Sequence, residues 1–493
     1  MTTDDDRHDN AQVQADGTTV DTPAPEPEAQ PQFEASSMSE SISHLDVEIV
    51  EKEIDETTEE EEYHPNDYTI DVEEPTDEEE DFLVEDDDDD EEEEEGYSEE
   101  ELQKPYGPVL LPMPDLSEFS IPLPSSFKEE FDQPIEPPPL APLPNILHVQ
   151  TLLKPYDEIN DPSPSLQGLQ VFHMGRETGL TGEMQAMYVR LPPGTRLSRP
   201  VAHQLGDVIV YCISGSGLLW QNGWTFPFNT TDAVGWKAGT GITHTIINDT
   251  NADGGVGEDI NLLIAYEDKL LESNYYPLDQ EFATSSGKSI WKDPPPQGDL
   301  GPHPGVPSLS PERGNLTIPP VQLKYRPSNV VNTITELDGI GEGELFANAT
   351  SLSQETALSG RFGCNFEVPP PGARSSEPHA HSLEDELVYV VSGSGNVWLN
   401  GHVSPVNEGD VIGFPAGTGI AHCFINDSNA NGEEGNPLML WILGQNRVRE
   451  GDLVFYPLKV NEAANVASKR WWPNAPLYEL GPHDGHATRP LRF

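Results

Sequence analysis

Short apolar runs separated by polar turns fill most of the chain after residue 145. Runs rich in Val, Ile, Tyr and Trp, such as residues 208–213 (VIVYCI) and 387–391 (LVYVV), alternate with clusters of Gly, Asn, Asp, Ser and Pro. Short runs of this kind, without a sustained 3.6-residue apolar period, are typical of β-strands. The pattern predicts an all-β fold, either a sandwich or a barrel.

These two runs are apolar at consecutive positions. Successive side chains of a strand point to opposite faces, so each of these strands is apolar on both faces. One face covers the strand's own core, and the other has to be covered by a second layer or domain. We therefore expect two units that pack against each other.

The chain contains a duplicated segment. Residues 192–217 align with residues 370–395 (PPGARSSEPHAHSLEDELVYVVSGSG), and residues 238–254 align with residues 416–432, both at an offset of 178 without an insertion. The repeat is about 160 residues long, which is the size of one domain. The prediction is two copies of one domain, at residues 145–305 and 328–493, joined by a linker at 306–327.

The first hundred residues are strongly acidic. They hold 42 Asp and Glu residues against Arg7 and Lys52, which is a net charge of −40 out of −63 for all 493 residues, and the acidic run from Glu85 to Glu95 is unbroken. Such a segment has too few apolar side chains to offset the entropy lost on ordering, and its charges repel one another. We predict a disordered acidic tail at residues 1–104.

Residues 105–144 contain twelve prolines interleaved with Leu, Ile and Phe, which predicts a Pro-rich extended arm. For the acidic tail, the favoured interpretation is a solvated segment that aids solubility, and the alternative is a segment that recruits a basic protein partner. A chain this acidic is a poor partner for nucleic acid or an anionic membrane, so neither is expected.

The cysteines and the amino terminus favour an intracellular location. Cys212, Cys364 and Cys423 are too few and too scattered for a disulfide framework. The first residues, MTTDDDRHDN, lack the basic region and apolar core of a signal peptide. We expect a cytoplasmic protein, with the nucleus as the alternative location. A homo-oligomer is compatible with the sequence.

The second copy carries three histidines and one glutamate in a pattern that favours a metal site. His379 and His381 are two residues apart, so in a strand both imidazoles point into one cavity. Glu386 heads an apolar run, where a carboxylate is costly to bury unless a cation compensates its charge. His422 follows a glycine-containing turn. Any one histidine alone is better explained by ordinary hydrogen bonding, whereas four matching positions favour a metal.

Three imidazoles and one carboxylate suit a divalent ion of iron, manganese, nickel, copper or zinc. In an octahedral ion they leave two positions for water, dioxygen or substrate. Binding needs neutral histidine, which dominates at physiological pH.

These residues resemble the two motifs of the cupin superfamily. The first motif, a glycine, an HxH pair, a glutamate and a second glycine, is matched by Gly372, His379, His381, Glu386 and Gly393. The second motif is matched by Gly409, Pro415, Gly417, His422 and Asn426, with a gap of four residues before His422 that is two longer than usual. The resemblance implies that each copy is a double-stranded β-helix, or jelly-roll barrel, and that the chain is a bicupin similar to fungal and bacterial cupin-domain proteins.

The first copy departs from the motif. Val201 and Val208 stand at the positions of the first histidine and the glutamate, so that only His203 and His244 remain. Two histidines without the carboxylate make a degenerate metal site. The favoured interpretation is a copy kept for packing and solubility, and the alternative is an apolar ligand pocket without metal.

The resemblance implies a metal-dependent enzyme that acts on a small oxygenated molecule. A dioxygenase-like oxidoreductase is the favoured form, and a decarboxylase or an isomerase is a less favoured one. Decarboxylation needs a proton donor, which the sequence does not identify, and no catalytic residue beyond the ligands is assigned. The alternative is a non-catalytic cupin that holds a small molecule or a metal and whose acidic tail recruits a basic protein.

Overall fold

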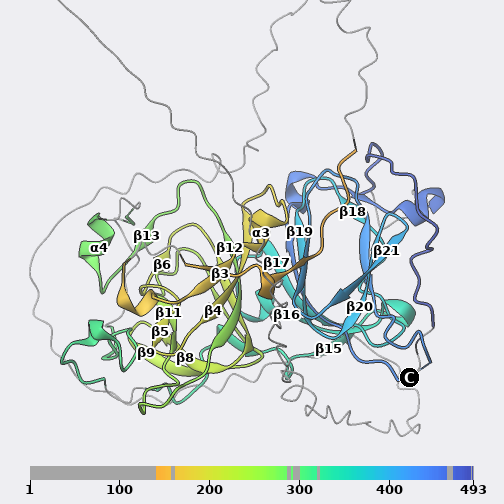
Figure 1. Ribbon diagram of the computed structural model, residues 1–493. Helices are drawn as coiled ribbons and strands as arrows, with labels where there is room; N and C mark the ends of the chain where they lie inside the picture. Colours follow the sequence, from red (N-terminus) through yellow and green to blue (C-terminus); the bar gives the residue numbers. More distant parts are fainter. Residues whose placement is uncertain are drawn as a thin grey trace, which may run out of the picture. The chain divides into compact units, whose positions relative to one another are not determined.

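The computed structural model describes two β-barrels (Figure 1). The described residues are 140–156, 162–285, 290–291, 300–318, 322–432, 434–462, 470–489 and 491. The predicted acidic tail and most of the predicted Pro-rich arm lie outside these residues.

Within the described residues, the first barrel pairs a seven-stranded sheet with a four-stranded sheet, and a two-stranded ribbon lies at its mouth. The large sheet has the order β14 (Val330–Asn332), β10 (Asp232–Trp236), β7 (Val208–Ser214), β12 (Ile260–Glu267), β4 (Met184–Leu191), β3 (Gln170–Phe172) and β2 (Lys154–Pro155). The small sheet and the ribbon are β5 (Thr195–Arg196), β11 (His244–Asn248), β8 (Ser216–Gln221) and β9 (Trp224–Asn229), followed by β6 (Ala202–His203) with β13 (Asn274–Tyr275).

The second barrel repeats this arrangement strand for strand along its large sheet. The order is β1 (Leu147–His148), β22 (Asp410–Phe414), β19 (Glu386–Ser392), β24 (Met439–Gln445), β17 (Phe362–Val368), β16 (Ala347–Ser351) and β15 (Asp338–Ile340). The small sheet and the ribbon are β21 (His402–Asn407), β20 (Ser394–Leu399) and β23 (His422–Ile425), followed by β18 (Ala380–His381) with β25 (Val454–Phe455). The expectation of an all-β fold with two jelly-roll barrels is confirmed.

Helices are short in the described residues, and none of them is long and apolar enough to cross a membrane. The α-helices are α3 (Met174–Glu177), α4 (Gln280–Ser285) and α5 (Leu352–Glu355). The 3₁₀ turns are η2 (Val149–Thr151), η3 (Pro164–Leu166), η4 (Pro311–Arg313), η5 (Gly343–Leu345), η6 (Val448–Glu450) and η7 (Pro457–Glu462).

Each barrel receives an edge strand from the segment that precedes the other barrel. Strand β1, which comes before the first barrel in the chain, pairs with β22 of the second, where Leu147 lies opposite Val411. Strand β14, which comes before the second barrel, pairs with β10 of the first. The exchange covers one edge of each large sheet and ties the two barrels together through backbone hydrogen bonds.

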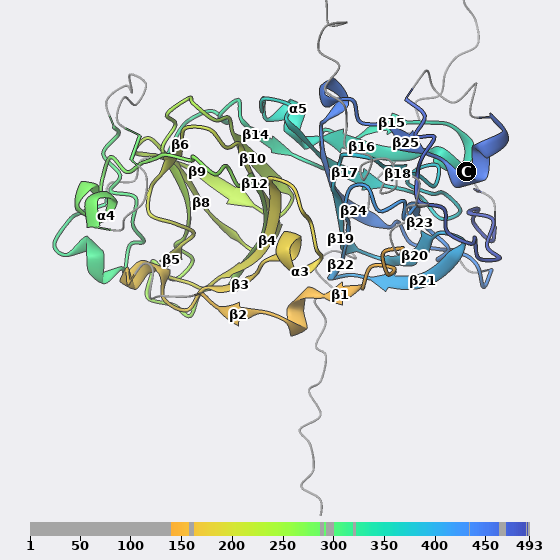
Figure 2. The same ribbon diagram turned by 90° about the horizontal axis from the view of Figure 1, so that it is seen from above.

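The barrels lie side by side (Figure 2) and share a hydrophobic core. Ile209 and Tyr211 of β7 belong to this shared core, whereas Val208 and Val210 of the same strand face the inside of the first barrel. Across the contact, the rings of Tyr211 and Phe366 are 5.5 Å apart between centroids. The prediction that the consecutive apolar runs are covered on both faces is therefore confirmed.

Reciprocal carboxylates reinforce the same contact. Asp385, which is fully buried, accepts hydrogen bonds from the backbone N–H groups of Thr181 and Gly182 in the first barrel, at 2.7 and 2.6 Å. The equivalent Asp207 accepts one from the N–H of Ser359 in the second barrel, at 2.7 Å. Because Asp385 is the neighbour of Glu386, the barrel contact also fixes the start of β19.

The turn after β19 depends on glycine. Gly393 has a φ of +84°, and a Cβ at this position would lie 2.3 Å from the carbonyl oxygen of Pro437. Gly215 has the same role in the first barrel, at a φ of +91°. A side chain at either position is therefore strained and sterically blocked.

Phe366→Ala removes a fully buried ring from the contact between the barrels. Truncation of a buried Phe to Ala costs about 3–5 kcal/mol, so we expect a clearly lower midpoint in urea unfolding followed by tryptophan fluorescence. The matched control is Val403→Ala on β21, where the side chain is 40% exposed and the expected change is within about 0.5 kcal/mol. Equal midpoints for the two variants would contradict the shared core.

Candidate metal centre

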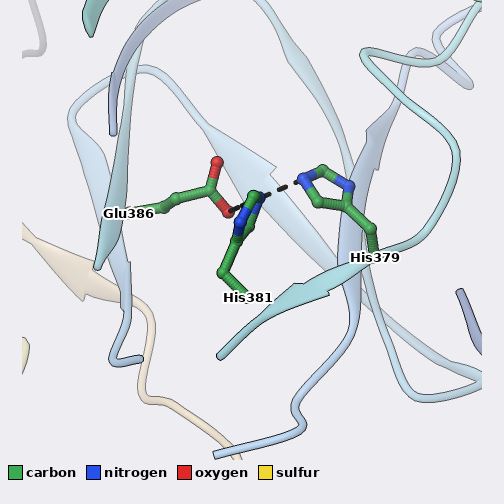
Figure 3. Close-up of side chains that lie close together, drawn as sticks. All are labelled: His379, His381 and Glu386. Carbon is green, nitrogen blue, oxygen red and sulfur yellow. Dashed lines mark ion pairs between the residues drawn. The ribbon is translucent and has the colours of Figure 1, made fainter. Parts of the chain in front are cut away.

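The four predicted ligands come from three parts of the second barrel. His379 and His381 flank Ala380 at the mouth ribbon, and Glu386 is the first residue of β19. His422 begins β23, and its backbone pairs with that of His379. Figure 3 shows His379, His381 and Glu386 pointing toward one another. One ligand atom from each of these three lies within 4.8 Å of the other two.

One oxygen of Glu386 lies at the centre of this group. Its Oε2 atom is 3.1 Å from Nε2 of His422, 3.7 Å from Nε2 of His379 and 3.9 Å from Nε2 of His381. This oxygen is buried and accepts no hydrogen bond of acceptable geometry from the described residues. A buried carboxylate oxygen left without a partner is costly.

Each histidine is oriented through its other ring nitrogen. Nδ1 of His379 lies 2.8 Å from the carbonyl oxygen of Glu377, and Nδ1 of His422 lies 3.4 Å from that of Ile420. Because a carbonyl only accepts, the proton of each neutral imidazole is assigned to Nδ1. The Nε2 atoms then present lone pairs toward Glu386. Hydrogen-bond acceptors that converge in this way repel one another unless a cation lies among them. These nitrogen and oxygen atoms therefore fit a divalent metal as its ligands.

Asp452 is a candidate functional residue that the sequence interpretation missed. It is 1% exposed, and its Oδ2 accepts a hydrogen bond from Nδ1 of His381 at 2.8 Å. The carboxylate also accepts from the N–H of Leu383 and from Arg470, at 2.9 and 2.7 Å. A carboxylate behind a metal-binding histidine fixes the ring and raises its basicity. The only signal in the sequence was an acid just before β25, seventy-one residues after the histidine.

A second acidic group around His381 has a sufficient explanation without a metal. Glu384 and Asp452 could join Nδ1 of His381 as three ligands. Arg470 lies between these carboxylates, 2.7 Å from Asp452 and 3.9 Å from Glu384. Glu384 also accepts the N–H of Arg447 at 2.8 Å. The charges are thus compensated by protein groups, and the group serves to hold His381.

The charges of the centre set the protonation of two ligands. Burial raises the pKa of Glu386, but in the absence of a metal the hydrogen bonds and positive charge of protonated His379 and His422 outweigh this effect and hold the pKa well below its usual value. Burial lowers the pKa of His381, but the hydrogen bond to Asp452 and the charge of Glu386 raise it to about 8. A proton with this pKa competes with a metal below pH 8, so metal affinity rises with pH up to about 8.

Glu367 places a second carboxyl group inside the same barrel. Along β17, Phe362, Cys364, Phe366 and Val368 face the other barrel, so Glu367 faces the interior. Burial and the charge of Glu386 raise the pKa of Glu367 to about 7, although His379 opposes the shift. Sequence reasoning missed this residue, although the alternation of FGCNFEV already places the acid on the face opposite the apolar residues.

The first barrel keeps two of the four candidate ligand positions as histidine. His203 and His244 lie near each other, with ring centroids 5.6 Å apart, and Nδ1 of His244 is 3.0 Å from the carbonyl oxygen of Ile242. Trp236 stacks on His244 at 3.7 Å, as Phe414 stacks on His422 at 3.5 Å in the second barrel. Val201 and Val208 line the cavity beside these histidines. Among the described residues of this barrel, no carboxylate joins the two histidines in a ligand group.

The second barrel matches a known family. Residues 365–442 match the model described as Cupin domain. Curated proteins give no significant match. Among solved structures, a deletion mutant of Bacillus subtilis oxalate decarboxylase is 17% identical, with a TM-score of 0.38 over 62% of this chain and 78% of that one. A formate complex of Lactobacillus farciminis oxalate decarboxylase is 14% identical, with a TM-score of 0.40 over 65% and 90%.

Those structural likenesses are too low in identity and score to carry a conclusion about activity. The family match and the barrel topology define the second barrel as a cupin domain. The first barrel has the same strand order along its large sheet, so the chain has the architecture of a bicupin, and the resemblance to cupins is confirmed.

Asp452→Asn tests how the centre is held together. Above pH 8, where proton competition at His381 has ended, loss of the orienting carboxylate lowers the affinity for Mn²⁺ or Zn²⁺ by about 10–100-fold in metal titration. The pH at which affinity levels off moves down toward the ordinary histidine pKa, because the charge that raised it is removed. Asp484→Asn, with a side chain that is 78% exposed, is the control. An unchanged affinity and pH profile in Asp452→Asn would contradict the assignment.

Proposed function

We propose that this chain is a metal-dependent enzyme whose centre in the second barrel acts on a small oxygenated molecule. The observation that carries the proposal is the buried, unpartnered Oε2 of Glu386, with three imidazole Nε2 atoms 3.1–3.9 Å away. In this proposal His379, His381, Glu386 and His422 are the ligands, and the metal is a divalent ion of iron, manganese, nickel, copper or zinc.

The bound ion would act as a Lewis acid, and its open coordination positions would accept the oxygen atoms of a substrate. The protein holds the ligands in place: Glu377 and Ile420 through their carbonyl groups, and Asp452 through its carboxylate. Asp385 anchors both sides of the site, since it also accepts the N–H of Ala416, just before the turn to His422, at 2.7 Å. Such anchoring favours a preorganised centre.

Two forms of chemistry are compatible with this centre. The resemblance to cupins favours an oxygen-dependent oxidation, in which dioxygen would be the oxidant and the bound metal would offer open positions to both reactants. Glu367 favours a second candidate, a redox-neutral reaction such as decarboxylation, in which CO₂ leaves and a proton takes its place on the carbon. The carboxyl group of Glu367, with its pKa raised to about 7, supplies the internal proton donor that this chemistry needs.

A non-catalytic binding role is the alternative. There the same centre holds a metabolite or a structural metal, and the acidic tail recruits a basic protein. The tail lies outside the described residues, so its partner and the expected cytoplasmic location rest on the sequence alone.

Metal content is the first test of the proposal. We expect about one divalent ion per full-length chain in elemental analysis, because only the second barrel keeps the carboxylate. His381→Ala and Glu386→Gln should lose the ion, whereas His203→Ala in the first barrel should keep it. Retention of metal by Glu386→Gln, or its loss in His203→Ala, would contradict the assignment.

The reaction class is tested with the metal-loaded protein. A panel of diols, diketones, phenols and small carboxylic acids is screened for oxygen uptake and for CO₂ release without oxygen uptake. The first result supports oxidation, and the second supports decarboxylation. A loaded centre that does neither, together with loss of a bound basic protein on removal of residues 1–104, supports the binding alternative.

Glu367→Gln tests the proton donor. If Glu367 supplies the proton, the rate of CO₂ release falls as pH rises through its pKa, and the bound cation places this fall at or below about pH 7 because it favours the carboxylate. In the variant, the rate should no longer fall with pH in this way and should be about 10²–10⁴-fold lower. The variant should keep its metal. The measurement is kcat against pH, with Glu408→Gln as the control. A variant with the wild-type profile would remove Glu367 from the mechanism.

A further inference from the structure

The first barrel contains a cavity where the second barrel has its candidate metal centre. The cavity has a volume of about 340 Å³ and is lined by residues that include Val201, His203, Val208 and His244. These are the four positions that correspond to His379, His381, Glu386 and His422. A volume near 340 Å³ lies within the range of about 300–1,000 Å³ that is typical of small-molecule sites.

Most of the wall is hydrocarbon. Leu169, Met187, Val189, Val210 and Ile264 line it together with the ring of Trp236. Protein interiors are packed without large voids, and an unfilled cavity weakens the fold. A copy kept only for packing would be expected to fill this space with larger side chains, yet valine occupies both positions from which the metal ligands are missing. The cavity therefore favours a ligand-binding role for the first barrel over a role in packing alone.

The charges around the cavity favour a neutral ligand. Among the described residues no Lys or Arg lines it, so an anion would find no cation on this part of the wall. Its acidic residue, Glu267, is already bound by Arg361 at 2.8 Å and by the N–H of Asp207 at 3.0 Å, so it is not available to pair with a cationic ligand. Burial holds the pKa of His244 well below its usual value, an effect that His203 reinforces. An ionised ligand would lose its hydration without compensation.

Two residues that line the cavity, Asn274 and His244, offer hydrogen-bond acceptors. Oδ1 of Asn274, on a residue that lines the cavity, is buried and has no hydrogen-bond partner in the described part of the chain. Nδ1 of His244 is engaged with the carbonyl of Ile242, which assigns the acceptor lone pair to Nε2. A ligand hydroxyl or N–H group would satisfy such an acceptor.

We propose that the first barrel binds a neutral, mainly apolar small molecule that carries one hydrogen-bond donor, such as a phenol or a cyclic alcohol, in the cavity between Val201, Val208 and Asn274. This site needs no metal and is separate from the centre in the second barrel.

The test uses the full-length, metal-loaded chain and three probes of similar size in isothermal titration calorimetry. The probes are 1-naphthol, 1-methoxynaphthalene, which lacks the donor, and 1-naphthoate, which is charged. We expect 1-naphthol to bind once per chain, 1-methoxynaphthalene to bind about five- to tenfold more weakly, and 1-naphthoate not to bind measurably. Absence of saturable binding of 1-naphthol, or equal binding of 1-naphthoate, overturns the proposal.

Two variants locate the site. Val208→Phe fills the cavity and should weaken 1-naphthol binding by about tenfold or more, while Glu386→Gln in the second barrel should leave it unchanged. Asn274→Leu keeps a similar volume but removes the unpartnered acceptor, so it should reduce the preference for 1-naphthol over 1-methoxynaphthalene, with His244 as the acceptor that remains. Retained metal content reports that each cavity variant is folded. If Val208→Phe does not fold, Asn274→Leu provides the decisive result, and an undiminished preference for 1-naphthol in that variant overturns the proposal.

Discussion

The centre of the second barrel depends on a carboxylate oxygen and three imidazole nitrogens that converge and that, once the imidazoles are neutral, have no hydrogen-bond donor among them. The Nδ1 protons of the histidines are engaged with Glu377, Asp452 and Ile420, and the Nε2 atoms face the buried Oε2 of Glu386. In a protein interior such an arrangement is unfavourable by itself. A cation at its centre converts the repulsion into coordination. This requirement explains why each ligand is held from behind by a further group.

The shared core between the barrels supports the same centre. Asp385 joins the two barrels through Thr181 and Gly182 and also holds the N–H of Ala416 before His422. Glu386 is therefore positioned by a residue that belongs to the barrel contact. The two barrels share one fold but differ in the residues at this site, because Val201 and Val208 replace a histidine and the glutamate in the first barrel. One copy thus presents a polar centre and the other an apolar cavity.

Sequence patterns predicted the parts of this structure that follow from short-range rules. Consecutive apolar residues in β7 and β19 predicted strands covered on both faces, and the HxH spacing predicted that His379 and His381 share one cavity. Asp452 and Glu367 were not predicted, because their roles depend on strands that meet only in the folded barrel. The exchange of β1 and β14 between the barrels was missed for a different reason, because edge strands of two and three residues leave no clear apolar period in the sequence.

The most direct test of the central claim is anomalous diffraction from a crystal of the protein grown with Mn²⁺ or Zn²⁺. The account predicts one strong peak in the second barrel, about 2.0–2.3 Å from Oε2 of Glu386 and from the Nε2 atoms of His379, His381 and His422. It predicts no peak of similar height between His203 and His244. A metal bound elsewhere, with these four side chains left apart from it, would contradict the account.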